Sequence, residues 1–451
     1  MAYSKEIEEL LKKLKIKVGD SIKVARGSTV YEGLLMPRIE AGDVNCLVVK
    51  LDSGYNVGIE FSRETKVEKQ KGKKVEEEKF AVKKLEIDPK KPTIAVLATG
   101  GTIVSRVDYK TGGAFPAFSA DDLASAIPEL AGIANLRGKL IRNMLSEDMV
   151  FEHYSLIARE IEKEIKKGAD GIIVLHGTDT MHFTSAALSF MLRELPVPVI
   201  LVGAQRSSDR GSSDAAMNLI CATHFIANSD FAEVAVCMHG SESDDYCVVL
   251  PGTKVRKMHT SRRDAFRAIN TLPWARIDYA SRKIEFLRSS YAKKDKKKKL
   301  KVLDKTEKKV GLLKTYPGID SAMFEFFLKE NYKGLVIEGT GLGHAPVTEL
   351  DEFTKENARN LAILRKLVEK GCVVVMTSQC VYGRVNMNVY ANGREILRAG
   401  VISGEDMLPE VAYLKLKWLL GNYAGEKAKE MVSQNIAGEI SEKRESSGFL
   451  V

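Results

Sequence analysis

The chain has 451 residues, so we expect more than one domain, because a single hydrophobic core stops growing near ~250 to 300 residues. Hydrophobic residues make up 44% and charged residues 29%, which is typical of a globular protein. The net charge of +9 permits an acidic partner such as nucleic acid, although solvated lysine faces explain it better.

Membrane and secreted classes are disfavoured by the sequence. No stretch approaches the ~18 uninterrupted apolar residues of a membrane-spanning helix, and residues 1–16 lack the apolar core of a secretory signal. The six cysteines lie in apolar contexts such as Cys221, Cys237 and Cys372, without metal-ligand spacing. We therefore expect buried thiols in a reducing, cytoplasmic protein without a disulfide framework.

The first 91 residues predict a small separate domain. Residues 4–15 have helical apolar spacing, and 18–61 contain four short β-like runs with a hairpin turn at 52–54. This pattern predicts an SH3-like β-barrel that serves in docking, since such small barrels are rarely catalytic. Residues 63–91 are highly charged and are expected to form a linker or a solvated connecting strand.

The stretch 92–105, PTIAVLATGGTIVS, predicts a buried strand that enters a tight glycine loop. Thr99 and Thr102 flank two glycines, which can adopt positive φ and allow a ligand close to the backbone. The loop fits neither G-x-G-x-x-G nor G-x-x-x-x-G-K-[ST]. A hydroxyl at this position lies at the carboxyl end of a strand, where ligand crevices form.

Strands and helices then alternate along the chain. Glycine and proline within 107–118 suggest a mobile flap near the site, and the segments that follow predict helix 151–167, strand 171–175, a helix from 180, strand 198–204 and helix 215–227. Apolar strands that are each followed by a helix indicate a mostly parallel sheet covered on both faces. A lysine-rich run at 293–301 is better explained as a solvated connection than as a nucleic-acid contact.

A second α/β unit begins near residue 311 and ends with a helix at 408–420. The predicted domains are therefore 1–91, 92–309 and 310–451, the last including a charged tail without an evident role. In the middle domain, the loops TGGT at 99–102 and HGTDT at 176–180 share one crevice if their strands are neighbours. A threonine nucleophile in such a crevice needs a base or proton relay, for which Thr178 and Asp179 with an amine are suitable.

Residues 92–420 resemble the bacterial-type L-asparaginase family. The resemblance lies in TGGTI, SEDM, VLHGTDTM, VGAQR and PGTKVRKMHTSRRDAFRAIN, which occur in the family's order. It implies a two-domain α/β core with parallel sheets. It also implies a nucleophile at Thr102 and a second group formed by Thr178, Asp179 and Lys257.

The same resemblance implies four substrate-binding positions. Ser146 matches a substrate-binding serine, and Asp179 would also hold the α-amino group of the substrate. Glu147 stands where the family often has glutamine, and Tyr109 is the nearest candidate for the flap tyrosine, although the spacing around Gly112 departs from the family pattern.

Within the family, the chain more closely resembles the amidase subunits of archaeal amidotransferases that act on glutamyl-tRNA(Gln), in which a small β-barrel precedes an asparaginase domain. The resemblance implies hydrolysis of glutamine or asparagine, and ammonia supply to a partner, the E subunit, that amidates Glu-tRNA(Gln). ATP and Mg²⁺ would then act in the partner, which agrees with the lack of a P-loop in this sequence. No cofactor or metal is expected in this chain. A homodimeric core within an α2β2 heterotetramer is expected.

Two other functions remain open at this stage. A free cytosolic asparaginase or glutaminase would use the same threonines, and the N-terminal barrel disfavours it. A non-catalytic nucleic-acid-binding scaffold would use the positive charge, and the presence of all four residues Thr102, Thr178, Asp179 and Lys257 disfavours it.

Overall fold

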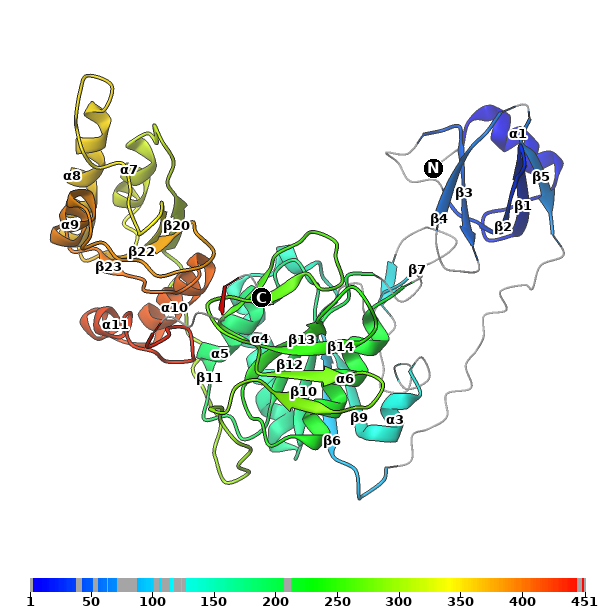
Figure 1. Cartoon of the computed structure of the whole chain (residues 1–451), viewed down its shortest axis with the longest axis horizontal. Helices are drawn as coiled ribbons and strands as arrows, with labels where there is room; N and C mark the ends of the chain where they lie inside the picture. Colours follow the sequence, from blue (N-terminus) through cyan, green and yellow to red (C-terminus); the bar gives the residue numbers. More distant parts are fainter. Residues whose placement is uncertain are drawn as a thin grey trace.

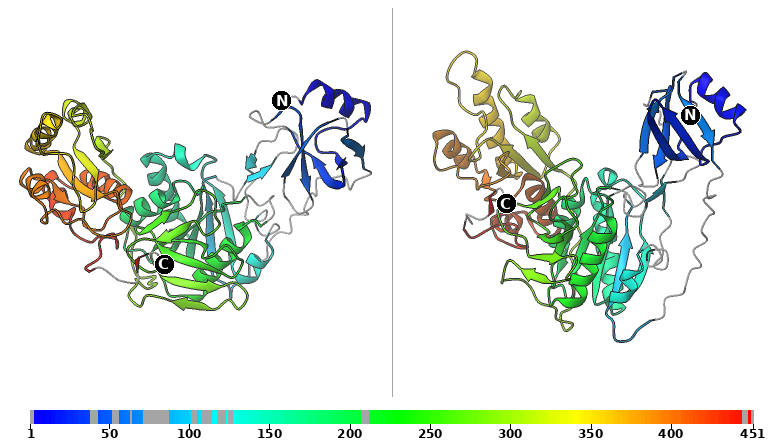
Figure 2. Two further views of the ribbon diagram at one scale, coloured as in Figure 1. Left: turned by 45° about the horizontal axis from the view of Figure 1, so that its top comes forward. Right: turned by 45° about the vertical axis from the view of Figure 1, so that its right-hand side comes forward.

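The computed structural model describes residues 3–37, 43–51, 56–62, 64–70, 87–100, 105–107, 114–116, 123, 127–206, 212–443 and 448–449. Three bodies follow one another along the chain: a small β body, a large α/β body and a smaller α/β body (Figure 1). The β body stands apart from the other two in both views of Figure 2. This architecture confirms the predicted α/β core preceded by a small β-rich domain.

The N-terminal body is a five-stranded antiparallel sheet in the order β4-β3-β2-β1-β5. Its elements are α1 (Lys5–Lys13), β1 (Ser21–Arg26), β2 (Thr29–Leu35), β3 (Cys46–Leu51), β4 (Asn56–Glu60) and β5 (Lys66–Lys69). Alternate residues of the strands are buried against Ile7 and Leu11 of α1. Strand β5 lies in the stretch predicted as a linker or connecting strand, and it pairs with β1 although Val67 is its single buried residue.

The large body is built on an eight-stranded sheet in the order β18-β17-β14-β13-β12-β10-β6-β9. Strands β9, β6, β10, β12 and β13 run parallel, and β14, β17 and β18 extend the sheet antiparallel. The bounds are β6 (Thr93–Ala98), β9 (Asn135–Leu140), β10 (Gly171–Leu175), β12 (Val199–Val202), β13 (Val234–His239), β14 (Tyr246–Pro251), β17 (Ala275–Asp278) and β18 (Ile284–Phe286). The prediction of a mostly parallel sheet is confirmed.

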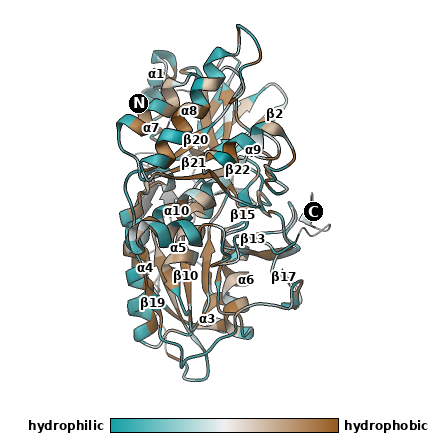
Figure 3. Ribbon diagram, turned by 90° about the vertical axis from the view of Figure 1, so that its left-hand side faces the viewer, coloured by the Kyte–Doolittle hydropathy of each residue, from teal (hydrophilic) through white to brown (hydrophobic). Residues whose placement is uncertain are grey.

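Helices cover both faces of this sheet. One apolar core joins the sheet to α4 (Phe151–Lys166) and α5 (Met181–Met191), and another joins it to α3 (Glu129–Ile133) and α6 (Ala215–Asn228). Every residue of β10 is buried, as a strand between two helical layers requires. Figure 3 shows the hydrophobic strand β10 beside helix α4, which is mostly hydrophilic.

The large body also contains three pairs of short strands outside its main sheet. They are β7 (Ser105–Val107) with β8 (Ala114–Pro116), β11 (Leu192–Arg193) with β19 (Lys301–Val302), and β15 (Val255–Lys257) with β16 (Phe266–Ala268). A 3₁₀ turn, η1, covers Ser146–Asp148. Strands β7 and β8 fall at or within the predicted flap, most of which lies outside the described residues.

The smaller body carries a four-stranded parallel sheet in the order β20-β21-β22-β23. Its elements are β20 (Val310–Lys314), α7 (Ala322–Lys329), β21 (Gly334–Gly339), α8 (Lys355–Glu369), β22 (Val373–Ser378), α9 (Ala391–Arg398), β23 (Ile402–Ser403), α10 (Pro409–Asn422) and α11 (Gly425–Met431). Helices α7, α8 and α9 pack on one face of the sheet. Helix α10 packs on the other face and against α5, so one apolar core continues between the two α/β bodies.

The chain after α11 fastens the two α/β bodies together. We call residues 432–441 the tail segment. Lys415 of α10 donates to the Val432 and Gln434 carbonyls and forms a fully buried ion pair with Glu439. From the large body, Arg193 donates to the Ile436 carbonyl at 2.8 Å and Thr253 to the Ala437 carbonyl at 3.0 Å. The tail thus has a structural role that its sequence did not indicate.

The lysine-rich run also lies on the large body. Lys293, Lys296 and Lys301 form ion pairs with Asp230, Asp170 and Glu194. These contacts favour the interpretation of the run as a surface connection. No helix among the described residues has both the length and the apolar character needed to cross a membrane.

The six cysteines differ in exposure. Cys221, Cys237, Cys247 and Cys372 are buried, as expected. Cys46 is half-buried and Cys380 is exposed, so the prediction of uniform burial is wrong for these two. Cys380 lies just after the end of β22, where the chain leaves the sheet for the surface.

Candidate active site

The two hydroxyl-bearing loops start side by side because their strands are neighbours. Strands β6 and β10 pair in parallel, with Ala98 opposite Leu175, so both loops leave the sheet at the same edge. The amide and the hydroxyl of Thr99 both donate to the Leu175 carbonyl, at 3.0 and 2.9 Å. The two loops therefore start at the same edge of the sheet, where ligand crevices form, and the rest of the first loop lies outside the described residues.

Lys257 joins the second threonine to its neighbouring aspartate. Its Nζ donates to Thr178 Oγ1 at 2.9 Å and to Asp179 Oδ1 at 2.7 Å. The lysine side chain is 11% exposed, whereas that of Asp179 is 66% exposed. The amine is thus held inside the loop, and the carboxylate faces outward, where it can receive a cationic group of a ligand.

Ser146 lies against the same loop. The Thr180 hydroxyl donates to the Ser146 carbonyl at 2.6 Å, and the Thr180 amide donates to Ser146 Oγ at 3.4 Å. A Cβ on Gly177 would lie 2.9 Å from the Ser146 Cβ, so only glycine allows this approach. Ser146 is buried, whereas Glu147 beside it is exposed and lines a hollow that also includes Thr180. The structure therefore groups Ser146, Thr178, Asp179 and Lys257, with Glu147 at the rim.

Two predicted site residues, Thr102 and Tyr109, lie outside the described residues. The described chain reaches Gly100, directly before the predicted nucleophile loop. Gly100 has φ +117°, and a Cβ there would lie 2.4 Å from the Met144 carbonyl oxygen. Glycine is therefore required at the entrance to the loop, both for its backbone conformation and for space.

Sequence reasoning did not assign a role to two residues near Thr178, Gly203 and His176. A Cβ on Gly203, in the VGAQR motif after β12, would lie 2.8 Å from Thr178 Cγ2, so this loop packs directly on the threonine. His176 is fully buried behind it, with Nε2 2.8 Å from Thr184 Oγ1. Burial lowers the pKa of His176 to about 4, which keeps the imidazole neutral near pH 7. The sequence could have indicated Gly203 and His176, because both lie in motifs at the ends of strands.

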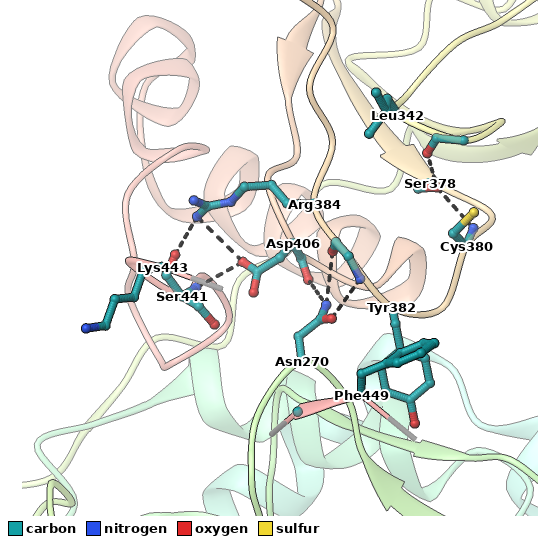
Figure 4. Close-up of a pocket in the computed structure, with 13 residues that line it drawn as sticks. Asn270, Leu342, Ser378, Cys380, Tyr382, Arg384, Asp406, Ser441, Lys443 and Phe449 are labelled. Carbon is teal, nitrogen blue, oxygen red and sulfur yellow. Dashed lines mark hydrogen bonds and ion pairs between the residues drawn. The ribbon is translucent and has the colours of Figure 1, made fainter. Parts of the chain in front are cut away.

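A separate hollow of about 320 Å³ lies between the two α/β bodies and the tail (Figure 4). Its polar side chains bind one another: Asn270 bonds both backbone groups of Gly383, and Asp406 accepts from Lys254 Nζ and the Ser441 amide. Arg384 contacts the Ser441 carbonyl and Glu405. These bonds join the bodies, so the polar groups of this hollow serve the interface.

The described residues contain no group of three or more histidine, cysteine, aspartate or glutamate side chains arranged to hold a metal ion. The chemistry that this part of the chain offers is that of hydroxyls, an amine and a carboxylate. Such a set can bind an amino acid and transfer an acyl group through a hydroxyl.

Comparison with known families matches all three bodies. Residues 93–291 match the family Asparaginase, N-terminal, and residues 309–432 match the Glutaminase/Asparaginase C-terminal domain. Residues 16–69 match the GatD N-terminal domain.

Solved structures share the α/β core. The thermostable L-asparaginase from Thermococcus kodakarensis is 30% identical, with a TM-score of 0.67 over 78% of this chain and 100% of that protein. L-asparaginase I from Vibrio cholerae is 32% identical, with a TM-score of 0.67 over 78% of this chain and 99% of that protein. Both comparisons confirm the asparaginase-like fold.

Full-length relatives include all three bodies. The D subunit of the glutamyl-tRNA(Gln) amidotransferase of Pyrococcus furiosus is 51% identical over 99% of this chain and 100% of its own length. The D subunit of the same enzyme from Methanothermobacter thermautotrophicus is 47% identical over 100% of both chains. On this full-length similarity, the chain belongs to the family of glutamyl-tRNA(Gln) amidotransferase D subunits, enzymes with an asparaginase-type amidase core.

Proposed function

We propose that this chain hydrolyses the side-chain amide of glutamine, or of asparagine, and supplies the ammonia to a partner protein. The observation that carries this proposal is the placement of Lys257 between Thr178 and Asp179, beside Ser146 and at the carboxyl ends of β6 and β10. The partner, the E subunit of the amidotransferase, would use ATP and Mg²⁺ to convert Glu-tRNA(Gln) to Gln-tRNA(Gln). No cofactor is assigned to this chain.

In the proposed reaction, the Thr102 hydroxyl oxygen bonds to the amide carbon of the substrate side chain. The carbon–nitrogen bond breaks, and the amide nitrogen leaves as ammonia with the hydroxyl proton, so an acyl ester remains on Thr102. Water then hydrolyses the ester and restores the hydroxyl. Each step needs a group that moves a proton, since a threonine hydroxyl is a weak nucleophile.

The described contacts suggest how Thr178 serves this step. Its oxygen accepts a hydrogen bond from Lys257, so its own hydrogen can donate to a second acceptor, such as the reacting amide. The positive amine also stabilises negative charge that develops nearby. Asp179 and Ser146 would hold the α-amino and α-carboxyl ends of the substrate, and Glu147 and Tyr109 would contribute from the rim and the flap.

The proposed assembly follows from the domain plan. We assign residues 1–91 to docking or positioning, 92–309 to the amidase site and 310–451 to the smaller α/β domain with the tail. A homodimeric core that binds two partner chains, an α2β2 heterotetramer in the cytoplasm, agrees with the preference of such folds for symmetric assembly.

A free cytosolic asparaginase or glutaminase is the second candidate, favoured because this chain covers the full length of the Thermococcus kodakarensis L-asparaginase. The N-terminal barrel favours the amidotransferase instead, since residues 16–69 match the GatD N-terminal domain.

One assay separates these functions. The pure chain is tested for glutamine hydrolysis alone, with the E subunit, and with both the E subunit and Glu-tRNA(Gln). The D subunit of an amidotransferase should form Gln-tRNA(Gln) only in the complete mixture. Vigorous hydrolysis that is unchanged by the partner, with no amidated tRNA, would support the free hydrolase.

The Thr102→Val variant then separates ammonia production from ammonia use. Valine keeps the branched shape, so the variant complex should lose glutamine-dependent amidation and keep amidation with added ammonium. Retained glutamine-dependent activity would place the nucleophile elsewhere, with Thr178 the next candidate. Lost ammonium-dependent activity in an intact complex would show that this chain also takes part in amidation.

A further inference from the structure

Three polar side chains meet where the second α/β body touches the elements of the candidate site. They are His182 of α5, Arg256 of β15 and Glu410 of α10. Glu410 Oε1 lies 3.6 Å from Arg256 Nε and 3.8 Å from His182 Nε2. Figure 3 shows α10 next to α5, with β15 beside them.

This cluster is costly for the fold as it stands. The Glu410 side chain is 5% exposed, and neither Glu410 Oε1 nor His182 Nδ1 has a hydrogen-bond partner among the described residues. A buried carboxylate oxygen without a hydrogen-bond partner destabilises a protein, and apolar residues of similar size often stabilise it more. Stability alone therefore does not explain why these three side chains are buried together.

Arg256 is the positively charged member of this cluster. Burial, together with the nearby positive charges of Arg256 and Lys257, lowers the pKa of His182 to about 3, so the imidazole is neutral near pH 7. Burial raises the pKa of Glu410, and Arg256 opposes that rise. The contact of Glu410 Oε1 with Arg256 Nε, at 3.6 Å, links α10 to β15.

Of the two elements that Glu410 faces, one carries a site residue and the other directly follows two of them. Strand β15 ends with Lys257, the residue directly after Arg256. Helix α5 begins directly after Thr180, so its first turn follows Thr178 and Asp179. Glu410 comes from the other α/β body, at the second position of α10 after Pro409. One carboxylate therefore touches the supports of both sides of the Lys257–Thr178 hydrogen bond.

We infer that Glu410 is a positioning residue for the amidase site: through Arg256 and His182 it holds β15 against α5, so that Lys257 Nζ stays within hydrogen-bond distance of Thr178 Oγ1. The inference rests on the proposed function of Lys257 and Thr178. It makes the site in one α/β body dependent on how the other body is seated, a dependence that Lys257 and Thr178 do not reveal by themselves.

The test uses the full-length chain in complex with its partner and measures glutamine hydrolysis. In Glu410→Gln the carboxyl group becomes an amide of the same shape, so kcat should fall about ten- to hundredfold, as small misplacements of catalytic groups do, with KM changed less than about twofold. Arg256→Gln should give the same pattern. The double variant should lose no more than the more impaired single variant, because both changes break one link.

Glu439→Gln is the matched control. Glu439 is equally buried and also pairs with a residue of α10, Lys415, but its other contacts are the amides of the tail segment. Its kcat per folded molecule should equal that of the parent. Amidation with added ammonium should be unchanged in all of these variants, because it does not require the amidase site.

Several results would overturn the inference. They are an unchanged kcat in a folded Glu410→Gln or Arg256→Gln variant, losses that multiply in the double variant, or an equal loss in Glu439→Gln. If Glu410→Gln does not fold, the half-exposed Arg256 provides the decisive variant. If Lys257→Met keeps full activity, the proposed role of Lys257 fails, which is distinct from a failure of Glu410 alone.

Discussion

Lys257 and Lys415 form ion pairs of nearly the same length in two regions of the molecule, at the candidate site and at the tail. The distances are 2.7 Å to Asp179 and 2.6 Å to Glu439. Lys415 and Glu439 are both fully buried, and their remaining bonds are to the backbone of the tail segment. Asp179 is largely exposed, and Lys257 also donates a hydrogen bond to the Thr178 hydroxyl.

The difference shows which pair can take part in chemistry. Burial lowers the pKa of Lys415, and Glu439 opposes that shift, so the pair is stable only while both members remain. All donors and acceptors of the Lys415–Glu439 pair are bonded to groups inside the protein, so none is available to a ligand. In the Lys257–Asp179 pair, Asp179 is exposed, so a substrate can bind to it. We therefore expect stability changes from variants of the first pair and activity changes from variants of the second.

The largest effect should come from breaking the tail pair. Lys415→Met leaves Glu439 as a buried carboxylate without its cation, which typically costs about 3 to 5 kcal/mol. The free energy of unfolding, measured by urea denaturation, should fall by that amount. Activity per folded molecule at low temperature should remain, and a stability equal to that of the parent would show that water replaces the lysine.

The next effect should come from the site pair, and it should appear in rate. Thr178→Val and Lys257→Met should each lower kcat for glutamine at least about 10²-fold, as the loss of a group that stabilises developing charge does. Their free energies of unfolding should stay close to that of the parent, because Asp179 is largely exposed and can be solvated. A large loss of stability with an unchanged kcat would reverse the comparison between the two pairs.

How far the sequence predicts the structure differs between these two regions. The strand-end motif pointed to Thr178 and Asp179, and the resemblance to the asparaginase family added Lys257; the pairing of β6 with β10 explains why strand-end motifs meet. The tail pair, the cluster around Glu410 and the strand β5 have no such signal. Ion pairs between distant segments leave no periodic pattern, and β5 has one buried residue in four. Burial of a lysine is decided by tertiary packing, which local sequence does not encode.

A smaller effect is expected from pH, through buried imidazoles near the site. His176 has a folded pKa of about 4 and an ordinary value of 6.5. Below pH 6.5 the unfolded chain binds a proton that the folded chain does not, so stability falls as pH decreases from about 6.5 to 4. Between pH 7 and pH 5 this amounts to about 2 kcal/mol.

The His176→Gln variant isolates that contribution. Its free energy of unfolding should decrease less between pH 7 and pH 5 than that of the parent, by about 2 kcal/mol, since glutamine does not titrate. Equal pH dependence in the parent and in His176→Gln would mean that His176 titrates normally in the folded chain.

The smallest effect on the core should come from removing the N-terminal β body, the predicted barrel. This body has its own apolar core, formed by α1 and the strands, and it is separate from the cores of the two α/β bodies. A chain that starts at Lys90 should therefore fold with nearly unchanged stability and keep the Lys257–Thr178 contact, which involves no barrel residue.

Amidation of Glu-tRNA(Gln) with the partner should nevertheless decrease, because the proposed role of the barrel is docking. Thermal unfolding and a pull-down with the E subunit measure the two properties separately. Failure of the truncated chain to fold would show that the barrel supports the core, and normal assembly with normal amidation would refute the docking role.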